Sequence, residues 1–530
     1  MKWILKTTLV LTFIFLSHSA FAATIYIDCS CSTNGDGTGQ TCGASGPKNA
    51  PVTTVSASTD YKYKAGVTCD LASTAITINQ NAVTISSYGT GSKPVITGGS
   101  TAYPIVLNST IGSSISDIAI TNGSSGAFNV NGSAVNSLVD GLDISTSLIG
   151  FIVNSAGISG LTLQNMDITC TGASSICTNV STNGGGVTFR DSSVTLTATN
   201  KSSANLIGLR LNGTSTLVDN VSIDGGDIGL EIRTTDGHIV RNSLVQNSAT
   251  SGIRMRDTSN NLIENNQVTG VWNGRYYNDG AGAGANGGTG AGIDLIDISD
   301  ACGNNIVRRN HIHNVFQGIL DQCDVEGGNK YYSNIIYDYL VNGISYQSDG
   351  AEGLIANNTI YHTPYDPVST AGHGIVIQNG SVTTQARIVN NTITCDAIGS
   401  NVQCINLPLS AATGPTYINN NNYYPLNGTP VATLGGVNYA TLALFQTALQ
   451  ADVDTTGDDS MSLSVNPYFT GGTSPVSKYG YRLSGDSTLR GAGTHVGSYT
   501  DLLGRPFEYT PSIGALEVGS RDFSSTRSFR

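Results

Sequence analysis

The sequence predicts an all-β fold, a parallel β-helix (solenoid) in which short strands stack coil upon coil. The main observation is a sequence motif that recurs between Asp219 and Cys395. It consists of an asparagine, an apolar residue two places on, and then a Gly-Ile or Gly-Leu pair that opens an apolar strand. A repeat of 21–26 residues with strand-type apolar pairs is typical of stacked coils. Leucine-rich repeats have a similar length, but their Leu-x-x-Leu-x-Leu frame is missing here.

The asparagines and the glycines of this motif recur at similar intervals. Successive asparagines lie 22, 24, 44, 24, 24 and 33 residues apart, and successive glycines 21, 23, 40, 26, 25 and 31 apart. Asparagine tolerates a left-handed φ, and stacked amides can hydrogen-bond from coil to coil, which predicts a turn at each asparagine. The asparagines are Asn220, Asn242, Asn266, Asn310, Asn334, Asn358 and Asn391, and the glycines are Gly208, Gly229, Gly252, Gly292, Gly318, Gly343 and Gly374.

Composition supports this fold class and narrows the partners. Of 530 residues, 39% are hydrophobic, only 12% are charged and 64 are glycine, a mixture that favours strands and turns over helices. The regular Ile, Val and Leu positions argue against disorder. A net charge of −12 argues against nucleic acid and anionic membranes as general partners. We expect a monomer.

The first 22 residues predict export. Lys2 and Lys6 precede an apolar run, and Ala20-Phe21-Ala22 fits a small-x-small cleavage site. The run is too short for a membrane-spanning helix, so we expect no integral membrane segment in the mature chain. We therefore expect a secreted protein, extracellular or periplasmic.

Ten cysteines fit an oxidising compartment. We expect three local disulfides, namely Cys170–Cys177, Cys302–Cys323 and Cys395–Cys404. The pairing among Cys29, Cys31, Cys42 and Cys69 stays open, although their spacing favours disulfides over zinc.

Four regions follow along the chain. Residues 1–22 are the signal peptide, 23–100 an N-terminal cap with the first coils, 101–425 the parallel β-helix and 426–530 a C-terminal cap region. Apolar residues at helical spacing predict one short amphipathic helix over 439–452 in the last region.

Three stretches resemble a known family. Thr24-Ile-Tyr-Ile-Asp28, followed by a Gly- and Cys-rich loop, resembles the opening of secreted bacterial right-handed β-helix proteins. The asparagine positions resemble the ladder of the pectate-lyase-like superfamily over about residues 24–425. Ser512-Ile-Gly-Ala-Leu-Glu517 is similar to the usual ending Asp-Ile-Gly-Ala-Tyr-Glu of the C-terminal cap, apart from Ser512 and Leu516. The resemblance implies right-handed coils and an active site on the face that carries the long loops.

The two long steps predict where that face lies. Both extra segments come just before a Gly-Ile strand, at Gly292 and Gly374, three coils apart. At about 4.8 Å per coil the two loops would stand roughly 14 Å apart. Two such walls above a floor of strands would form a groove for a short oligosaccharide.

Charged residues collect on this floor. Arginines pair with a uronate carboxylate bidentately, which acidifies the neighbouring C–H for β-elimination, and a tyrosine or histidine can serve as the base. Gly372-His373-Gly374 also resembles a polygalacturonase motif, without its preceding aspartate motifs. A solvated cross-strand ladder is the structural alternative for the charges. The catalytic candidates are Arg254, Arg256, Tyr276, His373 and Asp294, and the substrate-binding candidates are Glu231, Arg233, Trp272, Arg275, Tyr277, Gln322 and Gln347.

Carboxylates on adjacent coils suggest calcium as a possible cofactor. Asp294, Asp297, Asp321 and Asp324 offer the oxygen ligands that calcium prefers, although no EF-type loop is present. The same groups could form the acid–base pair of a hydrolase, or could keep a turn soluble.

Together these observations favour an exported polysaccharide-active protein, a lyase that cleaves an acidic, uronic-acid-containing glycan. The alternatives are a non-catalytic glycan-binding surface protein and a glycoside hydrolase. Which glycan and linkage the chain recognises does not follow from the sequence. His313, Tyr337 and Tyr361, 24 residues apart at one outward position, are expected to stack on the outside of the solenoid.

Overall fold

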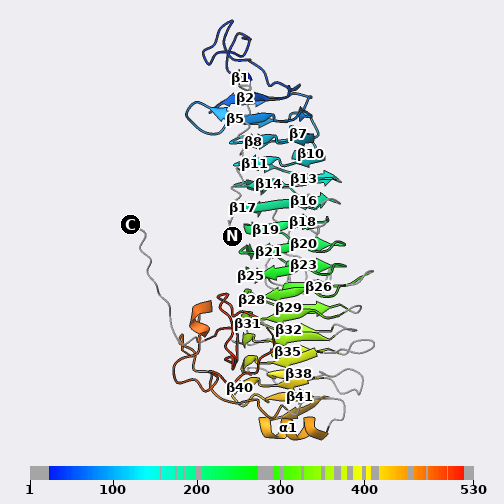
Figure 1. Cartoon of the computed structure of the whole chain (residues 1–530), viewed down its shortest axis with the longest axis vertical. Helices are drawn as coiled ribbons and strands as arrows, with labels where there is room; N and C mark the ends of the chain where they lie inside the picture. Colours follow the sequence, from blue (N-terminus) through cyan, green and yellow to red (C-terminus); the bar gives the residue numbers. More distant parts are fainter. Residues whose placement is uncertain are drawn as a thin grey trace, which may run out of the picture.

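The computed structural model describes residues 23–155, 157–172, 176–182, 185–197, 206–213, 215–271, 290–298, 302–323, 327–347, 352–362, 372–378, 386–396, 402–407, 417–451, 459–472, 475–497 and 499–517. It is an elongated stack of short parallel strands, with the N-terminal coils at one end and the helix α1 (Leu442–Ala451) at the other (Figure 1). The predicted fold class is confirmed.

A regular coil contributes three strands. In one coil these are β24 (Leu262–Glu264), β25 (Gln267–Val271) and β26 (Ala291–Ile296). Each pairs in parallel with its counterpart on the next coil, β27 (Ile306–Arg308), β28 (His311–Val315) and β29 (Gln317–Gln322). The first two strands of every coil belong to one bent sheet, sheet A, and the third belongs to sheet B.

The other strands follow the same scheme. The first half of sheet A also holds β1 (Ala23–Ile27), β2 (Thr59–Lys64), β5 (Thr84–Tyr88), β8 (Ser114–Ser116), β11 (Leu138–Asp140), β14 (Leu161–Gln164), β21 (Ile239–Arg241), β30 (Lys330–Tyr332), β33 (Gly353–Ala356), β36 (Ala386–Val389) and β39 (Tyr417–Asn419). Its second half holds β3 (Thr68–Asp70), β6 (Val95–Thr97), β9 (Ala119–Thr121), β12 (Asp143–Thr146), β15 (Asp167–Cys170), β22 (Leu244–Gln246), β31 (Ile335–Tyr339), β34 (Thr359–Tyr361), β37 (Thr392–Asp396) and β40 (Asn422–Leu426). Two strands, β17 (Val187–Leu196) and β19 (Leu217–Asp224), run through both halves.

Sheet B forms the third side of the solenoid. Its other parallel strands are β4 (Ile76–Ile78), β7 (Ile105–Ile111), β10 (Gly126–Val135), β13 (Ile149–Ser155), β16 (Ile176–Thr182), β18 (Ile207–Leu211), β20 (Ile228–Arg233), β23 (Ser251–Arg256), β32 (Asn342–Tyr346), β35 (His373–Ile377), β38 (Ile405–Leu407) and β41 (Ala432–Leu434). β42 (Val437–Tyr439) closes the sheet in the antiparallel sense.

One apolar core runs the length of the stack, because alternate residues of every strand point inward. On a single coil Ile263, Val268, Ile293 and Leu295 are fully buried and belong to one continuous cluster. At the C-terminal end α1 buries Phe445 and Leu449 against this cluster. The helix is three residues shorter at its start than the predicted 439–452, since β42 occupies Val437–Tyr439.

The repeat asparagines fall into two adjacent positions rather than one. The residue at the bend between the two halves of sheet A has a left-handed φ, and we call this column the asparagine corner: Asn165, Asp191, Asn220, Asn242, Asn265, Arg309, Ser333, Asn357, Asn390 and Asn420. The next residue on each coil is buried, and from Asn266 to Asn421 it forms an amide ladder. The predicted single set was therefore wrong for Asn220 and Asn242, which belong to the corner column.

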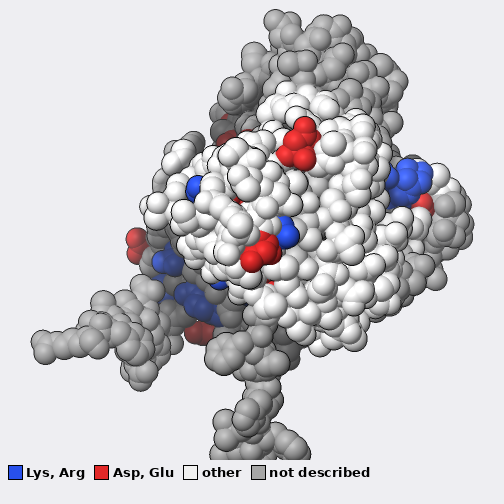
Figure 2. Space-filling view, turned by 90° about the horizontal axis from the view of Figure 1, so that it is seen from above, with Lys and Arg blue, Asp and Glu red and all other residues white. Residues whose placement is uncertain are grey.

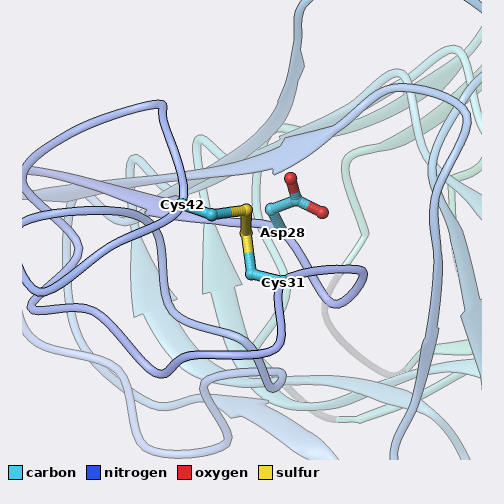
Figure 3. A group of neighbouring side chains, drawn as sticks. All are labelled: Asp28, Cys31 and Cys42. Carbon is cyan, nitrogen blue, oxygen red and sulfur yellow. A yellow bond between two sulfur atoms is a disulfide. The ribbon is translucent and has the colours of Figure 1, made fainter.

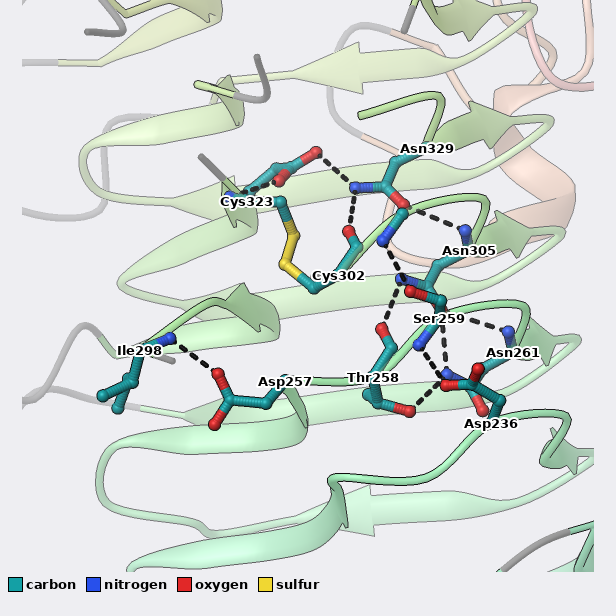
Figure 4. The surroundings of a disulfide bond; sticks show 12 residues. Asp236, Asp257, Thr258, Ser259, Asn261, Ile298, Cys302, Asn305, Cys323 and Asn329 are labelled. Carbon is teal, nitrogen blue, oxygen red and sulfur yellow. Dashed lines mark hydrogen bonds between the residues drawn. A yellow bond between two sulfur atoms is a disulfide. The ribbon is translucent and has the colours of Figure 1, made fainter. Parts of the chain in front are cut away.

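The disulfides close turns of the stack. All three expected pairs are present, and the open question at the N-terminus resolves as Cys29–Cys69 and Cys31–Cys42. Cys302–Cys323 lies beside a second buried ladder, in which Asn261, Asn305 and Asn329 hydrogen-bond from coil to coil (Figure 4).

The chain after α1 departs from the predicted end cap. Described residues 459–517 lie along the side of the stack, beside β31 and β40 (Figure 1). There Tyr481, Leu489 and Ile513 pack on Tyr337 and Tyr361, which point out of the solenoid but are buried. His313 and Tyr337 do stack, with ring centroids 5.0 Å apart, but this segment covers the predicted ladder.

Charged side chains are sparse on the N-terminal end of the molecule, where most described atoms belong to uncharged residues (Figure 2). Among the described residues, no helix has the length and apolar character needed to cross a bilayer.

Candidate functional site

The outer face of sheet B carries the predicted charges in one column. Parallel pairing places Arg210, Glu231, Arg254 and Asp294 side by side on four successive coils. Arg210 Nε lies 2.7 Å from Glu231 Oε2, and Arg254 Nε lies 3.0 Å from Asp294 Oδ2. We call these four residues the charge column. The predicted register of Glu231, Arg254 and Asp294 is confirmed.

The charge column is largely covered. Glu231 and Asp294 are buried, and the side chains of Arg210 and Arg254 keep only 20% and 19% of their exposure. Ser251 ties the column together, because its Oγ donates to Asp294 and accepts a hydrogen bond from Arg254. Arg254 and Asp294 therefore satisfy each other, and an incoming ligand must compete with that pair.

A second column lies two residues further along the same strands. Arg233 and Arg256 face each other in register on adjacent coils, followed by Ile296 and Gln322. Arg256 Nε is 3.5 Å from Asp257 Oδ2, whereas Arg233 has no ion pair among the described residues. We call Arg233 and Arg256 the arginine pair. Two guanidinium groups one strand spacing apart repel each other and attract an anion.

Several predicted site residues lie outside the described part of the chain. These are Trp272, Arg275, Tyr276 and Tyr277 of the first inserted loop and the metal candidate Asp324. Gln322 and Gln347 are described, and Gln347 donates its backbone N–H to Asp321.

His373 does not belong to the same site as the arginines. It opens β35, four coils from β23, which corresponds to roughly 19 Å along the stack. Burial, followed by the charge of neighbouring His362, lowers the pKa of His373 to about 4. The predicted catalytic set thus divides into an arginine region and a separate histidine region.

Two members of the predicted calcium cluster, Asp294 and Asp321, point in opposite directions. Asp294 pairs in register with Leu320 and points outward, whereas Asp321 pairs with Leu295 and points into the core. There Asp321 Oδ2 accepts from Tyr331 at 2.5 Å and from Asn329 at 3.2 Å, and Oδ1 accepts from the Cys323 N–H. Because Asp294 and Asp321 lie on opposite faces of one sheet, these two cannot share a cation, and Asp324 lies outside the described residues.

Another group of potential ligands lies near the N-terminus, where Asp28, Cys31 and Cys42 are neighbours (Figure 3). The two sulfurs are joined in a disulfide, so neither is a thiolate ligand. Burial tends to raise the pKa of Asp28, but bonds from Lys64 and Ser30 outweigh it and lower the pKa. The group is a structural ion pair under a disulfide.

Two residues of this face, Arg210 and Asp227, were not predicted as site residues from the sequence. Arg210 lies in the irregular part of the repeat, where its partner on the next coil could not be assigned. Asp227 directly precedes β20, and burial raises the pKa of its carboxyl group, while Arg254 acts in the opposite direction. Its main-chain carbonyl accepts the N–H groups of Thr250 and Ser251, which holds it beside the charge column. Gly225-Gly226-Asp227 had the appearance of an ordinary turn.

Residues 207–393 match a protein family described as the right handed beta helix region. The chain is a right-handed parallel β-helix. The match spans the coils that hold the charge column and the arginine pair, and it agrees with the right-handed coils that the resemblance implies. No curated protein matches the chain by sequence.

Solved β-helix structures are similar to it at low identity. Pectate lyase Pel9A is 15% identical, with 94% of this chain and 98% of that chain covered and a TM-score of 0.39. A double-mutant tailspike protein of E. coli bacteriophage HK620, in complex with a pentasaccharide, is 11% identical over 78% and 79%, with a TM-score of 0.44. Alginate lyase from Paenibacillus sp. str. FPU-7 is 14% identical over 67% and 97%, with a TM-score of 0.33. Similarity at this level carries no information about activity.

Proposed function

We propose that this β-helix is an exported, polysaccharide-active protein that binds an acidic glycan on the outer face of β20 and β23. The observation that carries the proposal is the arginine pair. Arg233 and Arg256 are adjacent like charges, and the carboxylates of the charge column are already bonded to Arg210 and Arg254. A uronate carboxylate would relieve the repulsion between the two guanidiniums and accept their N–H groups.

The proposed reaction is β-elimination. Neutralising the uronate carboxylate acidifies the adjacent C–H, and a base removes that proton while the glycosidic oxygen leaves from the neighbouring carbon. We assign the base to Tyr276 or Tyr277, in the loop that joins β25 to β26, because His373 lies four coils away. Glu231 and Arg254 lie two residues before the arginine pair on the same strands, which would place Arg254 next to the reacting sugar.

Hydrolysis is the second candidate, and Asp227 favours it. Its raised pKa provides a carboxyl group that stays protonated to higher pH than an ordinary aspartate, as a general acid requires. Glu231, four residues further along in β20, would be the partner carboxylate. The third possibility, a binder without catalysis, uses the same arginine pair.

The test uses soluble pectate, alginate and glycosaminoglycans, each with and without added calcium. Ultraviolet absorbance follows unsaturated product, a reducing-end assay follows all cleavage, and binding is measured in parallel. We expect unsaturated product with at least one uronan. Reducing ends without ultraviolet absorbance would assign a hydrolase, and binding alone would assign a non-catalytic protein.

Matched variants locate the site. Arg256→Ala and Arg233→Ala should each weaken binding of the acidic glycan at least tenfold, and Arg256→Lys less. Arg190→Ala is the control, because Arg190 is half exposed on sheet A and bonds Gln164. Equal binding by all four variants and the unaltered chain would overturn the proposed site.

A further inference from the structure

The asparagine corner is hollowed along part of its length. A groove of about 490 Å³ runs over the coils of β14, β17, β19 and β21, and its floor includes Asn165, Asp191, Asn220 and Asn242. Asp167, Ser193 and Ser222 line one side, and Leu244 adds apolar surface above buried Met166 and Val221. This groove lies on sheet A, away from the arginine pair on sheet B.

On later coils the same corner already holds polypeptide. Asn390 Nδ2 donates to the Thr494 carbonyl at 2.7 Å, and Asn390 Oδ1 accepts the Thr494 N–H at 2.9 Å. Ser333 Oγ donates to the Thr500 carbonyl at 2.8 Å, and Asn420 Nδ2 to that of Ala492 at 3.2 Å. The corner side chains therefore bind the backbone of the chain's own C-terminal segment.

The described chain ends while heading toward the groove. The Ile513 carbonyl accepts from Thr392, and the Ala515 N–H donates to Thr359 one coil earlier. The Glu517 N–H donates to Asp501. Asp501 directly follows Thr500, whose carbonyl accepts from Ser333 one further coil toward the N-terminus. The backbone thus passes about one coil for every two residues in the direction of Asn242.

Length and charge complement the groove. Thirteen residues, 518–530, follow Glu517, and an extended chain of that length reaches at most roughly 43 Å. The distance from the Ser333 coil to the Asn165 coil is six coils, roughly 29 Å. The segment carries Arg521, Arg527 and Arg530 against a single Asp522, whereas the groove offers two exposed carboxylates, Asp167 and Asp191, the second 3.7 Å from the half-exposed Arg190.

We propose that residues 518–530 bind in this groove, so that the C-terminal segment continues along the asparagine corner as far as the coil of Asn165. The arginines would pair with Asp167 and Asp191, and Phe523 would cover the apolar surface of Leu244. The proposal is independent of the glycan site, and either can fail without the other.

Cross-linking in the full-length chain tests it. Because all ten native cysteines are paired, Ser525→Cys can be combined with Ser222→Cys or Ser193→Cys. Eight extended residues after Glu517 reach roughly 26 Å, enough for either serine. The matched control is Ser525→Cys with Ser215→Cys, an exposed residue on the coil of Ser222 that lies before β19 and outside the groove. Mass spectrometry under mild oxidation should show the groove disulfides forming at least tenfold faster than the control disulfide.

Charge variants complete the test. Asp167→Asn with Asp191→Asn should slow the groove cross-link severalfold and remove most of its sensitivity to salt. Equal rates at Ser222, Ser193 and Ser215 would overturn the proposal. Cross-links found only between two molecules would also overturn it, in favour of a second copy as the occupant.

Discussion

Asn310 accepts two hydrogen bonds from Asn266 on the preceding coil, one from the backbone N–H at 3.0 Å and one from Nδ2 at 3.1 Å. Both residues are buried, and Asn310 in turn donates Nδ2 to Asn334 at 3.1 Å. The amide is thus the only side chain of its size that satisfies the backbone of one coil and the side chain of the next.

Replacing this amide should be costly. Asn310→Ala would remove the acceptor of the buried Asn266 backbone N–H and the Nδ2 donor to the Ile263 carbonyl, at about 1–3 kcal/mol for each orphaned group. We expect a fall in Tm of several degrees and faster hydrogen exchange at Asn266. Asn242→Gly is the control, because this exposed residue has φ 54°, which glycine tolerates, and it should change Tm little. Equal effects of the two substitutions would contradict the division of the asparagines into two columns.

Asp321→Asn should destabilise the fold without affecting any response to calcium. The new amide would present an NH2 group to Tyr331 or Asn329, both of which now donate to this carboxylate. We expect a loss of about 2–4 kcal/mol in unfolding free energy. Thermal unfolding with calcium and with a chelator distinguishes a metal ligand from a structural hydrogen-bond acceptor. Substitution of a metal ligand would abolish a calcium-dependent increase in Tm, whereas we expect Asp321→Asn to lower Tm equally with and without calcium.

Acid should weaken the fold through buried histidines. Burial lowers the pKa of His238 to about 4 and that of His311 to about 3, below the ordinary 6.5 of the unfolded chain. The unfolded chain therefore binds protons first, so this stability is complete above pH 6.5 and is lost as the pH falls from 6.5 toward 4. His238 alone accounts for on the order of 3 kcal/mol.

His238→Asn isolates that contribution. His238 occupies the position before Asn261 in the second ladder, where its N–H donates to Asn261 and its ring accepts from Thr216. An asparagine could continue the ladder without titrating, so the slope of Tm against pH between 6.5 and 4 should flatten. His495→Asn, at an exposed position of the C-terminal segment, should leave the slope unchanged. A variant slope identical to the original would remove His238 from the explanation.

Tyr481→Ala should loosen the C-terminal segment and spare the solenoid. Tyr481 is 1% exposed and packs its ring 5.2 Å from Tyr337 and 5.3 Å from Phe469. Removing a buried aromatic ring costs about 3–5 kcal/mol. We expect limited proteolysis to cut within residues 459–517 while the coils up to β40 stay intact. Tyr509→Ala, at an 89% exposed residue, provides the control.

The sequence reveals the solenoid because each coil must place apolar residues inward at a regular spacing. The outward column Glu231, Arg254 and Asp294 followed from that period. The register of the asparagines did not follow from the period, because Asn242 and Asn266 are the same residue type and differ only in backbone φ and burial.

Tertiary packing decided the remaining differences. Asp321 resembled a metal ligand because its inward direction depends on parity along β29, and Tyr331, its partner, lies ten residues on. Tyr337 and Tyr361 point outward and were predicted to form an exposed ladder, because no local sequence pattern indicates that the described residues of 459–517 pack over them. The residues of the inserted loops cannot be placed from a repeat that ends where the loops begin.

The amide ladder also gives the stack a direction. Each asparagine of the ladder donates its backbone N–H to the side-chain oxygen of the asparagine on the following coil. The last member, Asn421, therefore needs an acceptor from outside the repeat. Ser462 supplies it, with its Oγ 2.7 Å from the Asn421 N–H. Ser462 is thus a terminator, and a chain lengthened by duplicating whole coils upstream would still end correctly, whereas one shortened before Ser462 would not. The solenoid can vary in length at its middle, but it has a fixed last coil.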